Sequence, residues 1–173
     1  MPVERLPEYA SVNRAVGLGT HAFLELLPGA ASSPALRRIA GDGSARAALL
    51  RDAKVRVLPI PGYAFINVRK PCIELSWFYL KRGRGRDLYL DLLHELTHLR
   101  QHSEGAELWD PKFGYVDRPT EIEGYAVAVE EGIRLGMSDE EILSHLHNPW
   151  MSAAAAARLR RNVDEFLARS AKP

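Results

Sequence analysis

The sequence predicts an α+β fold that is mostly helical, with a small antiparallel sheet packed on one central helix. Helical spacings of apolar residues fill the first and last thirds of the chain, while β-type residues gather within residues 54–80. The 173 residues, 46% hydrophobic and 26% charged, suit one globular domain. We therefore expect a single domain over 1–173, with a motif-bearing core at 54–136 and helical flanks at 1–53 and 137–173.

The first third of the chain is expected to be helical. Residues 7–27 carry apolar side chains at helical spacings, although Gly17 and Gly19 weaken the pattern. Two short helices are expected over 33–41 and 43–53, because each segment has a serine near its start and is bounded by glycine.

The predicted sheet follows directly. KVRVLPIPG (54–62) has β-branched residues at alternating positions and ends in a Pro-rich turn. YAFINV (63–68) and CIELSWFYL (72–80) have the composition of two further strands, with RKP (69–71) as the turn between them. Together these segments predict a small antiparallel sheet.

The remainder of the chain is predicted to be helices joined by loops. A helix over about 87–103 follows the loop KRGRGR (81–86), and a loop over 104–119 leads to a helix in TEIEGYAVAVEEGIRLG (120–136). The next helix opens with a capping box formed by Ser138 and Glu141. A final amphipathic helix is expected in SAAAAARLRRNVDEFLARS (152–170).

The stretch LLHELTHLRQH (92–102) predicts a metal site. His94 and His98 lie one helical turn apart on the same face, so both imidazoles can reach one ion. Glu95 is offset by about 100° around the helix axis and suits the role of general base. This is the H-E-x-x-H arrangement of zinc metallopeptidases, in which zinc activates water and polarises the scissile carbonyl.

A third ligand is expected from the following helix. His102 continues the histidine spacing, but an unbroken helix would place it about 12 Å along the axis from His94. Glu121 and Glu123 are both carboxylates of the right type for a His₂Glu site. Thr120 and Glu123 form a possible capping box, which gives Glu123 a structural role and favours Glu121 as the ligand.

These motifs give the chain a resemblance to a known family. HELTH, a loop and TEIEGYAVAV together resemble the ImmA/IrrE-type zinc metallopeptidases, a compact gluzincin-like group, over residues 54–136. The resemblance implies a minimal zincin-like fold, zinc as the cofactor, Glu121 as a zinc ligand, and CIELSW as the edge strand near the substrate. The chain departs from the family pattern at Tyr125, where Asn or Asp is expected, and lacks the L-M-P ending of that helix.

Two further groups of polar residues are candidates for supporting roles. Tyr115 or Tyr125 could donate a hydrogen bond to an oxyanion, although each is more commonly a packed tyrosine. Asp91 lies about one helical turn before His94. It could orient the His94 imidazole, or it could be a solvated helix residue.

The leading functional prediction is a zinc-dependent metallopeptidase that cleaves a protein or peptide substrate. His94, His98 and Glu121 would bind zinc, and Glu95 would transfer a proton from water to the leaving amine. The alternative is a non-catalytic domain in which the metal stabilises a surface that binds a regulatory protein or nucleic acid.

Composition narrows the partners and the compartment. A formal charge of +1, with only one short basic run, KRGRGR, argues against nucleic acid as a partner. No apolar run approaches the roughly 20 residues that span a bilayer, and Glu25 interrupts the segment most like a secretory signal. The single cysteine, Cys72, suits a reducing compartment, so a cytoplasmic location is expected. The oligomeric state is not indicated by the sequence.

Overall fold

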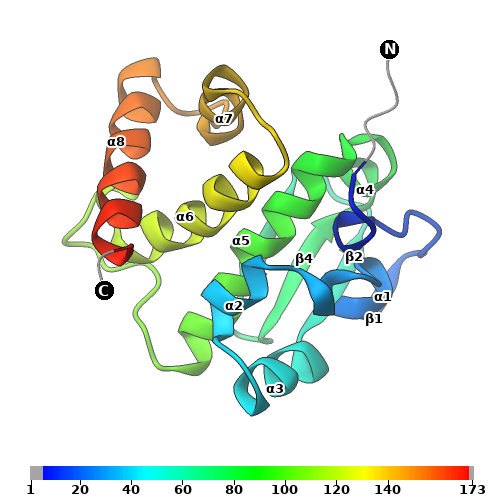
Figure 1. Ribbon diagram of the computed structural model, residues 1–173. Coiled ribbons are helices and arrows are strands. Elements are labelled where there is room, and N and C mark those ends of the chain that lie inside the picture. Colours follow the sequence, from blue (N-terminus) through cyan, green and yellow to red (C-terminus); the bar gives the residue numbers. More distant parts are fainter. Residues whose placement is uncertain (1–5, 172–173) are drawn as a thin grey trace.

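A computed structural model describes residues 6–171 and has the predicted α+β architecture. Most of the helices lie to one side of a small sheet, and the long helix α5 (Gly85–Ser103) contacts the sheet as well as α6 (Pro119–Arg134) (Figure 1). Residues 1–5 and 172–173 of the predicted flanks lie outside the described part.

The sheet has four strands and is mixed rather than wholly antiparallel. Its order is β1-β2-β4-β3, with β1–β2 and β3–β4 antiparallel and β2–β4 parallel. The prediction of a purely antiparallel sheet was therefore wrong in one pairing. Because β4 folds back from β3 and inserts beside β2, it runs in the same direction as β2. The strands are β1 (Gly19–Ala22), β2 (Lys54–Leu58), β3 (Ala64–Asn67) and β4 (Cys72–Ser76).

Strand β1 replaces part of the helix expected over residues 7–27. Only short helical segments occur there, a 3₁₀ turn at Glu8–Ala10 and α1 at Phe23–Leu26. Gly19 has φ of 127°, which a helix cannot accommodate, and the four residues of β1 pair with β2 instead. Non-local pairing thus overrides the local helical spacing.

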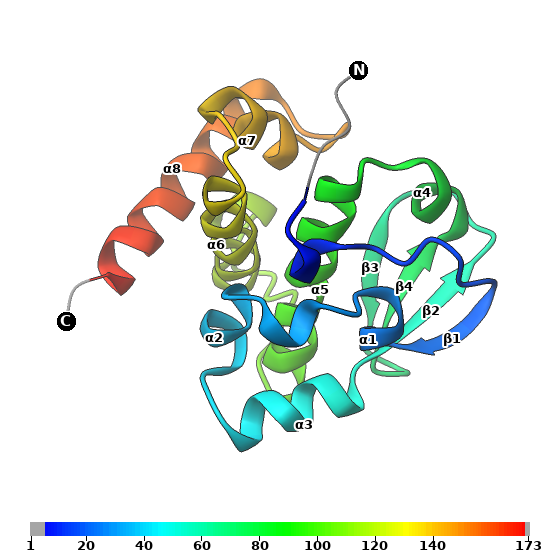
Figure 2. The ribbon, with the colours of Figure 1, turned by 45° about the vertical axis from the view of Figure 1, so that its right-hand side comes forward.

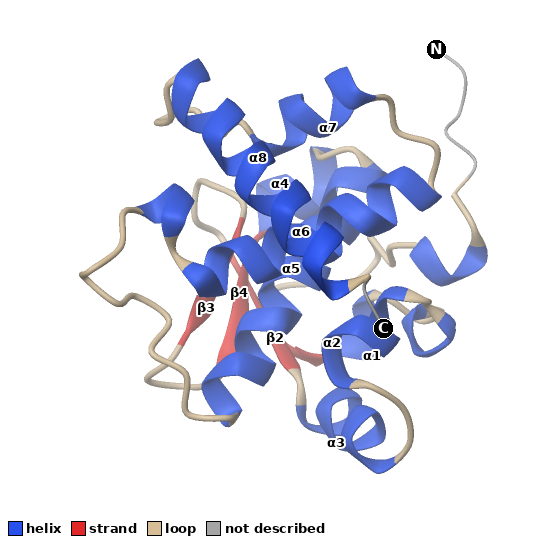
Figure 3. Cartoon of the chain, turned by 60° about the vertical axis from the view of Figure 1, so that its left-hand side comes forward, coloured by secondary structure: helices blue, strands red, loops and turns tan. Residues whose placement is uncertain are grey.

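Apart from α4, the other helices agree with the sequence in kind and approximate position (Figure 3). The loop expected over 81–86 is reduced to residues 83–84, because α4 ends at Arg82 and α5 begins at Gly85. The strand predicted over 72–80 is shorter than expected, because Ser76 accepts a hydrogen bond from the Tyr79 amide and begins helix α4. The capping box of Ser138 and Glu141 is confirmed at the start of α7. The remaining bounds are α2 (Ala35–Ala40), α3 (Ser44–Asp52), α4 (Trp77–Arg82), α7 (Asp139–Leu146) and α8 (Ala153–Ser170).

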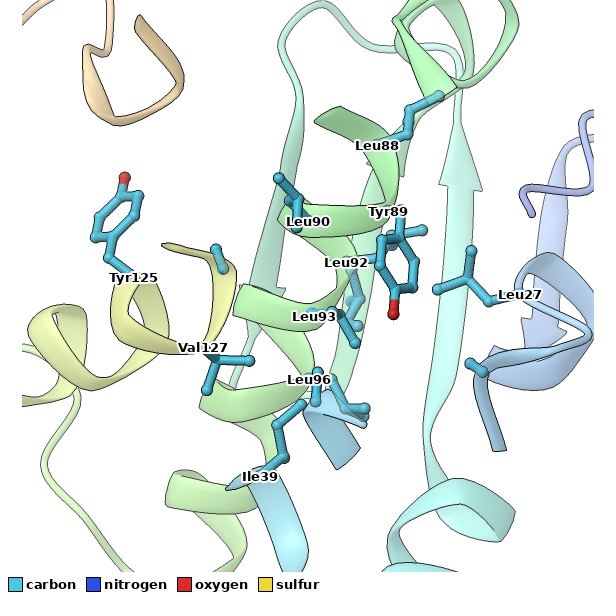
Figure 4. Packing of buried hydrophobic residues seen from close by; sticks show 14 of the residues in the cluster. Leu27, Ile39, Leu88, Tyr89, Leu90, Leu92, Leu93, Leu96, Tyr125 and Val127 are labelled. Carbon is cyan, nitrogen blue, oxygen red and sulfur yellow. The ribbon is translucent and has the colours of Figure 1, made fainter. Parts of the chain in front are cut away.

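Helix α5 is the centre of the hydrophobic core. Leu88 through Leu96 include side chains on several sides of the helix, with Leu27 on one side and Val127 on another (Figure 4). Residues of α5 contact β3 and β4 as well as α6, and α6 in turn contacts α8 (Figure 2). A helix held on so many sides has little freedom to rotate, so the polar side chains that it carries are fixed in direction.

No helix within residues 6–171 combines the length and apolar character that crossing a membrane requires. Cys72 is a free cysteine and is buried, as a small hydrophobic residue would be.

Candidate metal centre

His94 and His98 point their Nε2 atoms at the same place. The two atoms lie 2.9 Å apart, and both side chains are buried. One helical turn separates the residues, so the regular geometry of α5 alone brings the imidazoles together.

Glu121 in the first turn of α6 completes a cluster that could hold a metal ion. Its Oε2 atom lies 3.3 Å from His94 Nε2 and 3.5 Å from His98 Nε2. With zinc–ligand bonds of about 2.0–2.1 Å, two ligand atoms of a tetrahedral site lie about 3.3 Å apart. The spacing of the three donor atoms therefore fits such a site.

The electrostatics of the cluster also fit a cation. Glu121 Oε2 is buried and has no hydrogen-bond partner within residues 6–171. Burial opposes ionisation of Glu121, but His94 and His98 hold the pKa of its carboxyl group well below the usual range. Burial and the neighbouring His98 lower the pKa of His94, which favours the neutral imidazole that a metal requires.

A side-chain network sets the tautomer of His98. The Gln101 Nε2 group donates to the Thr120 carbonyl at 3.1 Å and to Glu123 Oε2 at 2.7 Å. Both of its N–H groups are thus committed to acceptors, so the Oε1 atom is the one that faces His98 Nδ1, at 2.8 Å. His98 must then carry its proton on Nδ1, which leaves the Nε2 lone pair directed at the cluster.

The start of α6 differs from the sequence prediction. The helix begins at Pro119, and Thr120 donates its hydroxyl to the Leu108 carbonyl instead of capping the helix. Glu123 accepts hydrogen bonds from Arg100 and Gln101, so its role is structural but it is not part of a capping box. The predicted capping box is wrong, although Glu121 is still the carboxylate in the cluster.

Gly124 allows α6 to approach the cluster closely. A Cβ atom at this position would lie 2.9 Å from both Cε1 and Nδ1 of the His94 ring. The ring also packs on Tyr125, with 4.3 Å between centroids. His94 Nδ1 has no hydrogen-bond partner within residues 6–171, and Asp91, a candidate to orient it, instead accepts from Tyr79 at 2.6 Å.

Glu95 lines the same cleft but is not one of the three clustered donors. Burial raises the pKa of the Glu95 carboxyl group to about 8. The nearby charges of Glu121 and Asp91 add to this shift, whereas His98 and a hydrogen bond with the Ile66 backbone oppose it. A carboxyl group whose pKa lies near neutrality is suited to accepting and returning a proton.

A cleft of ≈590 Å³ opens over the cluster. That volume is within the range of ligand-binding clefts in proteins. One wall is β3 and the preceding Tyr63, and the opposite side carries aromatic residues of the α5–α6 and α7–α8 connections. The expectation that CIELSW is the edge strand near the substrate is wrong, because β4 lies inside the sheet and β3 is the edge strand. The aromatic lining residues from those connections are Trp109, Tyr115 and Trp150.

Tyr115 and Tyr125 lie together in this cleft. Their hydroxyl groups are 2.8 Å apart, and Asn148 Nδ2 donates to the Tyr125 hydroxyl at 2.9 Å. Burial raises the pKa of Tyr125 to about 12, so its hydroxyl stays protonated at neutral pH. Asn148 and Trp150 were missed by sequence reasoning, because HNPW reads only as a helix end followed by a turn.

His102, which the helical rise excluded, lies at the end of α5 and outside the clustered group. Two arginines of the basic run KRGRGR are paired with acidic residues. Arg86 is buried and donates to Glu141 at 2.7 Å, and Arg84 lies 3.9 Å from Asp87. These acidic partners offset part of the positive charge of the run.

Comparison of the chain with protein-family models, curated proteins and solved structures finds no match. Functional inference therefore rests on the site itself.

Proposed function

We propose that this protein is a zinc-dependent metallopeptidase. The observation that carries the proposal is the convergence of donor atoms from His94, His98 and Glu121 at the floor of a cleft that Glu95 also lines. Two imidazoles and one carboxylate form a donor set typical of catalytic zinc, which keeps a further position open for water or substrate.

Each residue has a distinct role in the proposed reaction. When bound, zinc would lower the pKa of water to near 7 and polarise the carbonyl of the scissile bond. The Glu95 carboxylate accepts the proton released from water and returns it to the leaving amine. Tyr115 or Tyr125, both protonated, donates a hydrogen bond to the oxyanion that develops on the substrate.

The cleft also suits an extended peptide. Strand β3 pairs with β4 along one edge only, so its other edge is available to pair with the backbone of a bound chain. The exposed aromatic rings of Phe65, Trp109 and Trp150 provide apolar contacts for side chains on either side of the scissile bond.

The metal requirement can be tested by elemental analysis of the purified full chain. We expect one zinc per chain in the wild type, and loss of zinc in His94→Ala and Glu121→Ala. The His102→Ala variant is the matched control, because it removes a histidine of the same helix outside the cluster and should retain zinc. Full zinc retention in His94→Ala would contradict the proposed site.

Catalysis is tested separately with Glu95→Gln, which keeps the size of the side chain and removes its basicity. We expect unchanged zinc content and a fall of about 10²–10⁴-fold in kcat for a peptide identified by mass spectrometry from a mixed peptide library. If the wild type binds zinc and cleaves no peptide in the library, the non-catalytic alternative is favoured. The pairing of Arg84 and Arg86 with acidic side chains gives no support to a nucleic-acid surface.

A further inference from the structure

A second cavity lies away from the metal centre and is lined by residues of α2, α3 and the C-terminal half of α6, together with residues 32–34 before α2. Its volume is ≈660 Å³, and four arginines line it together with a single carboxylate, Glu130. The arginines are distant from one another in the sequence: Arg37, Arg38, Arg46 and Arg134. Because the four arginines do not form one basic run, the sequence pattern alone does not indicate that they lie together.

The guanidinium groups are only partly engaged. Arg38 donates from Nε and Nη2 to the two Glu130 oxygens, which uses two of its five N–H groups. Arg46 donates from Nη2 to the Ala31 carbonyl, and its Nη1 atom lies 4.0 Å from Asp42 Oδ1. The structure therefore leaves N–H groups of both arginines available for a further acceptor.

Arg37 and Arg134, like Arg46, have acidic partners that do not line the cavity. Arg134 donates to Glu131, whose side chain is fully buried, and Arg37 lies 3.6 Å from the exposed Asp42. Even with these partners included, four guanidinium groups face three carboxylates. The cavity keeps an excess of positive charge in a protein whose formal net charge is only +1.

We propose that this cavity binds a small ligand that carries two or more linked phosphate groups. Guanidinium groups form paired hydrogen bonds with phosphate oxygens, and arginines on three helices can surround a ligand that exceeds a single phosphate in size. None of the described residues lining the cavity is aromatic, so it offers no surface on which a nucleobase could stack. A compact polyphosphate fits this lining better than a nucleotide does.

The proposal is independent of the peptidase function. Glu121 lies in the first turn of α6, whereas Glu130 and Arg134 lie in its last turns, so the two cavities are built on opposite ends of one helix. A ligand in the arginine cavity would not touch the metal centre.

Isothermal titration of the full chain with pyrophosphate tests the proposal. We expect saturable binding that weakens as sodium chloride is raised, because the contacts are ionic. Replacement of Arg46 by Gln should weaken binding about tenfold, the loss expected for one set of charged hydrogen bonds. Arg51→Gln is the matched control: it removes the same charge from the same helix, but Arg51 pairs with Asp52 outside the cavity.

The titration is repeated with orthophosphate, inorganic tripolyphosphate and ATP as ligands. It is also repeated with pyrophosphate and chelator-treated protein. Weaker binding of orthophosphate, and binding of ATP no tighter than that of inorganic tripolyphosphate, would support recognition of linked phosphates alone. Tighter binding of ATP than of tripolyphosphate would overturn the exclusion of a base. Equal effects of Arg46→Gln and Arg51→Gln, loss of binding after chelation, or no binding of pyrophosphate would overturn the proposal.

Discussion

The two ends of helix α6 place charged groups in very different surroundings. At its first turn, Glu121 is 5% exposed and faces two buried imidazoles whose donor atoms are aligned on it. At its last turns, the Arg38 and Glu130 side chains are 23% and 35% exposed, and solvent reaches both. The buried cluster around Glu121 therefore holds its side chains in few geometries, whereas the partly exposed Arg38–Glu130 pair can adopt many.

The contrast shows how the local environment of a charged group determines the effect of a substitution. A buried charge without its partner is costly because no water replaces the lost contact, whereas an exposed ion pair is screened and weak. We therefore expect changes near Glu121 to alter metal binding and folding together. Changes near Glu130 should leave folding almost unaffected.

The largest effect is expected from adding a methyl group at Gly124. The new Cβ would meet the His94 ring at 2.9 Å, and packing on Tyr125 prevents that ring from moving away freely. Gly124→Ala should lower the free energy of unfolding of the metal-free protein by about 1–3 kcal/mol, as overpacking does, and should weaken zinc binding. Urea denaturation and chelator competition measure the two effects.

The control for this variant lies at the other end of the same helix. A Cβ at Gly132 would meet Met137 Sδ at 2.8 Å, but methionine has a flexible side chain that can move aside. Gly132→Ala should change the free energy of unfolding by less than about 1 kcal/mol, since the gain in helix propensity offsets the contact. Equal losses in the two variants would remove the distinction between the two ends.

An intermediate effect is expected from the network that orients His98. Gln101→Leu removes the acceptor for the His98 Nδ1 proton, so the imidazole loses its fixed tautomer and direction. We expect zinc affinity to fall about 10–100-fold, measured by competition with a chelator of known affinity. His102→Ala, at the neighbouring position, should leave the affinity unchanged, and a similar fall there would point to general damage to α5.

The smallest effect is expected at the arginine cavity. A double-mutant cycle with Arg38→Gln and Glu130→Gln should give a coupling energy between about 0 and 1 kcal/mol from urea denaturation, because both side chains are partly exposed. A coupling energy above about 3 kcal/mol would place this pair among buried ion pairs. The two ends of α6 would then be electrostatically alike.

The sequence predicted the parts of the site that depend on local geometry. His94 and His98 are one turn apart on a strongly apolar helix, so their convergence follows from helical periodicity. Glu121 could be preferred over Glu123 before the structure was known, but the argument used a capping box that does not form. The actual reason is that Arg100 and Gln101 bind Glu123 and hold it away from the cluster.

The parts that were missed depend on contacts between distant segments. Strand β1 forms because β2 offers it an edge, and β4 lies inside the sheet because β3 is folded outside it. Asn148 and Trp150 reach the cleft only because α7 and α8 pack against α6. No residue pattern within a short window reports such contacts, and the same is true of the four arginines around the second cavity.

The connection between α5 and α6 is anchored at both ends, and this has a consequence for its entropy. Gln101 binds the Thr120 carbonyl, and a metal held by His94, His98 and Glu121 would add a further link between the same two helices. Links that fix both ends of a loop reduce the number of conformations that the loop can adopt. The loop over residues 104–118, which carries Trp109 and Tyr115 into the cleft, would thus be restricted at both ends before any substrate arrives. Less ordering then remains to oppose binding.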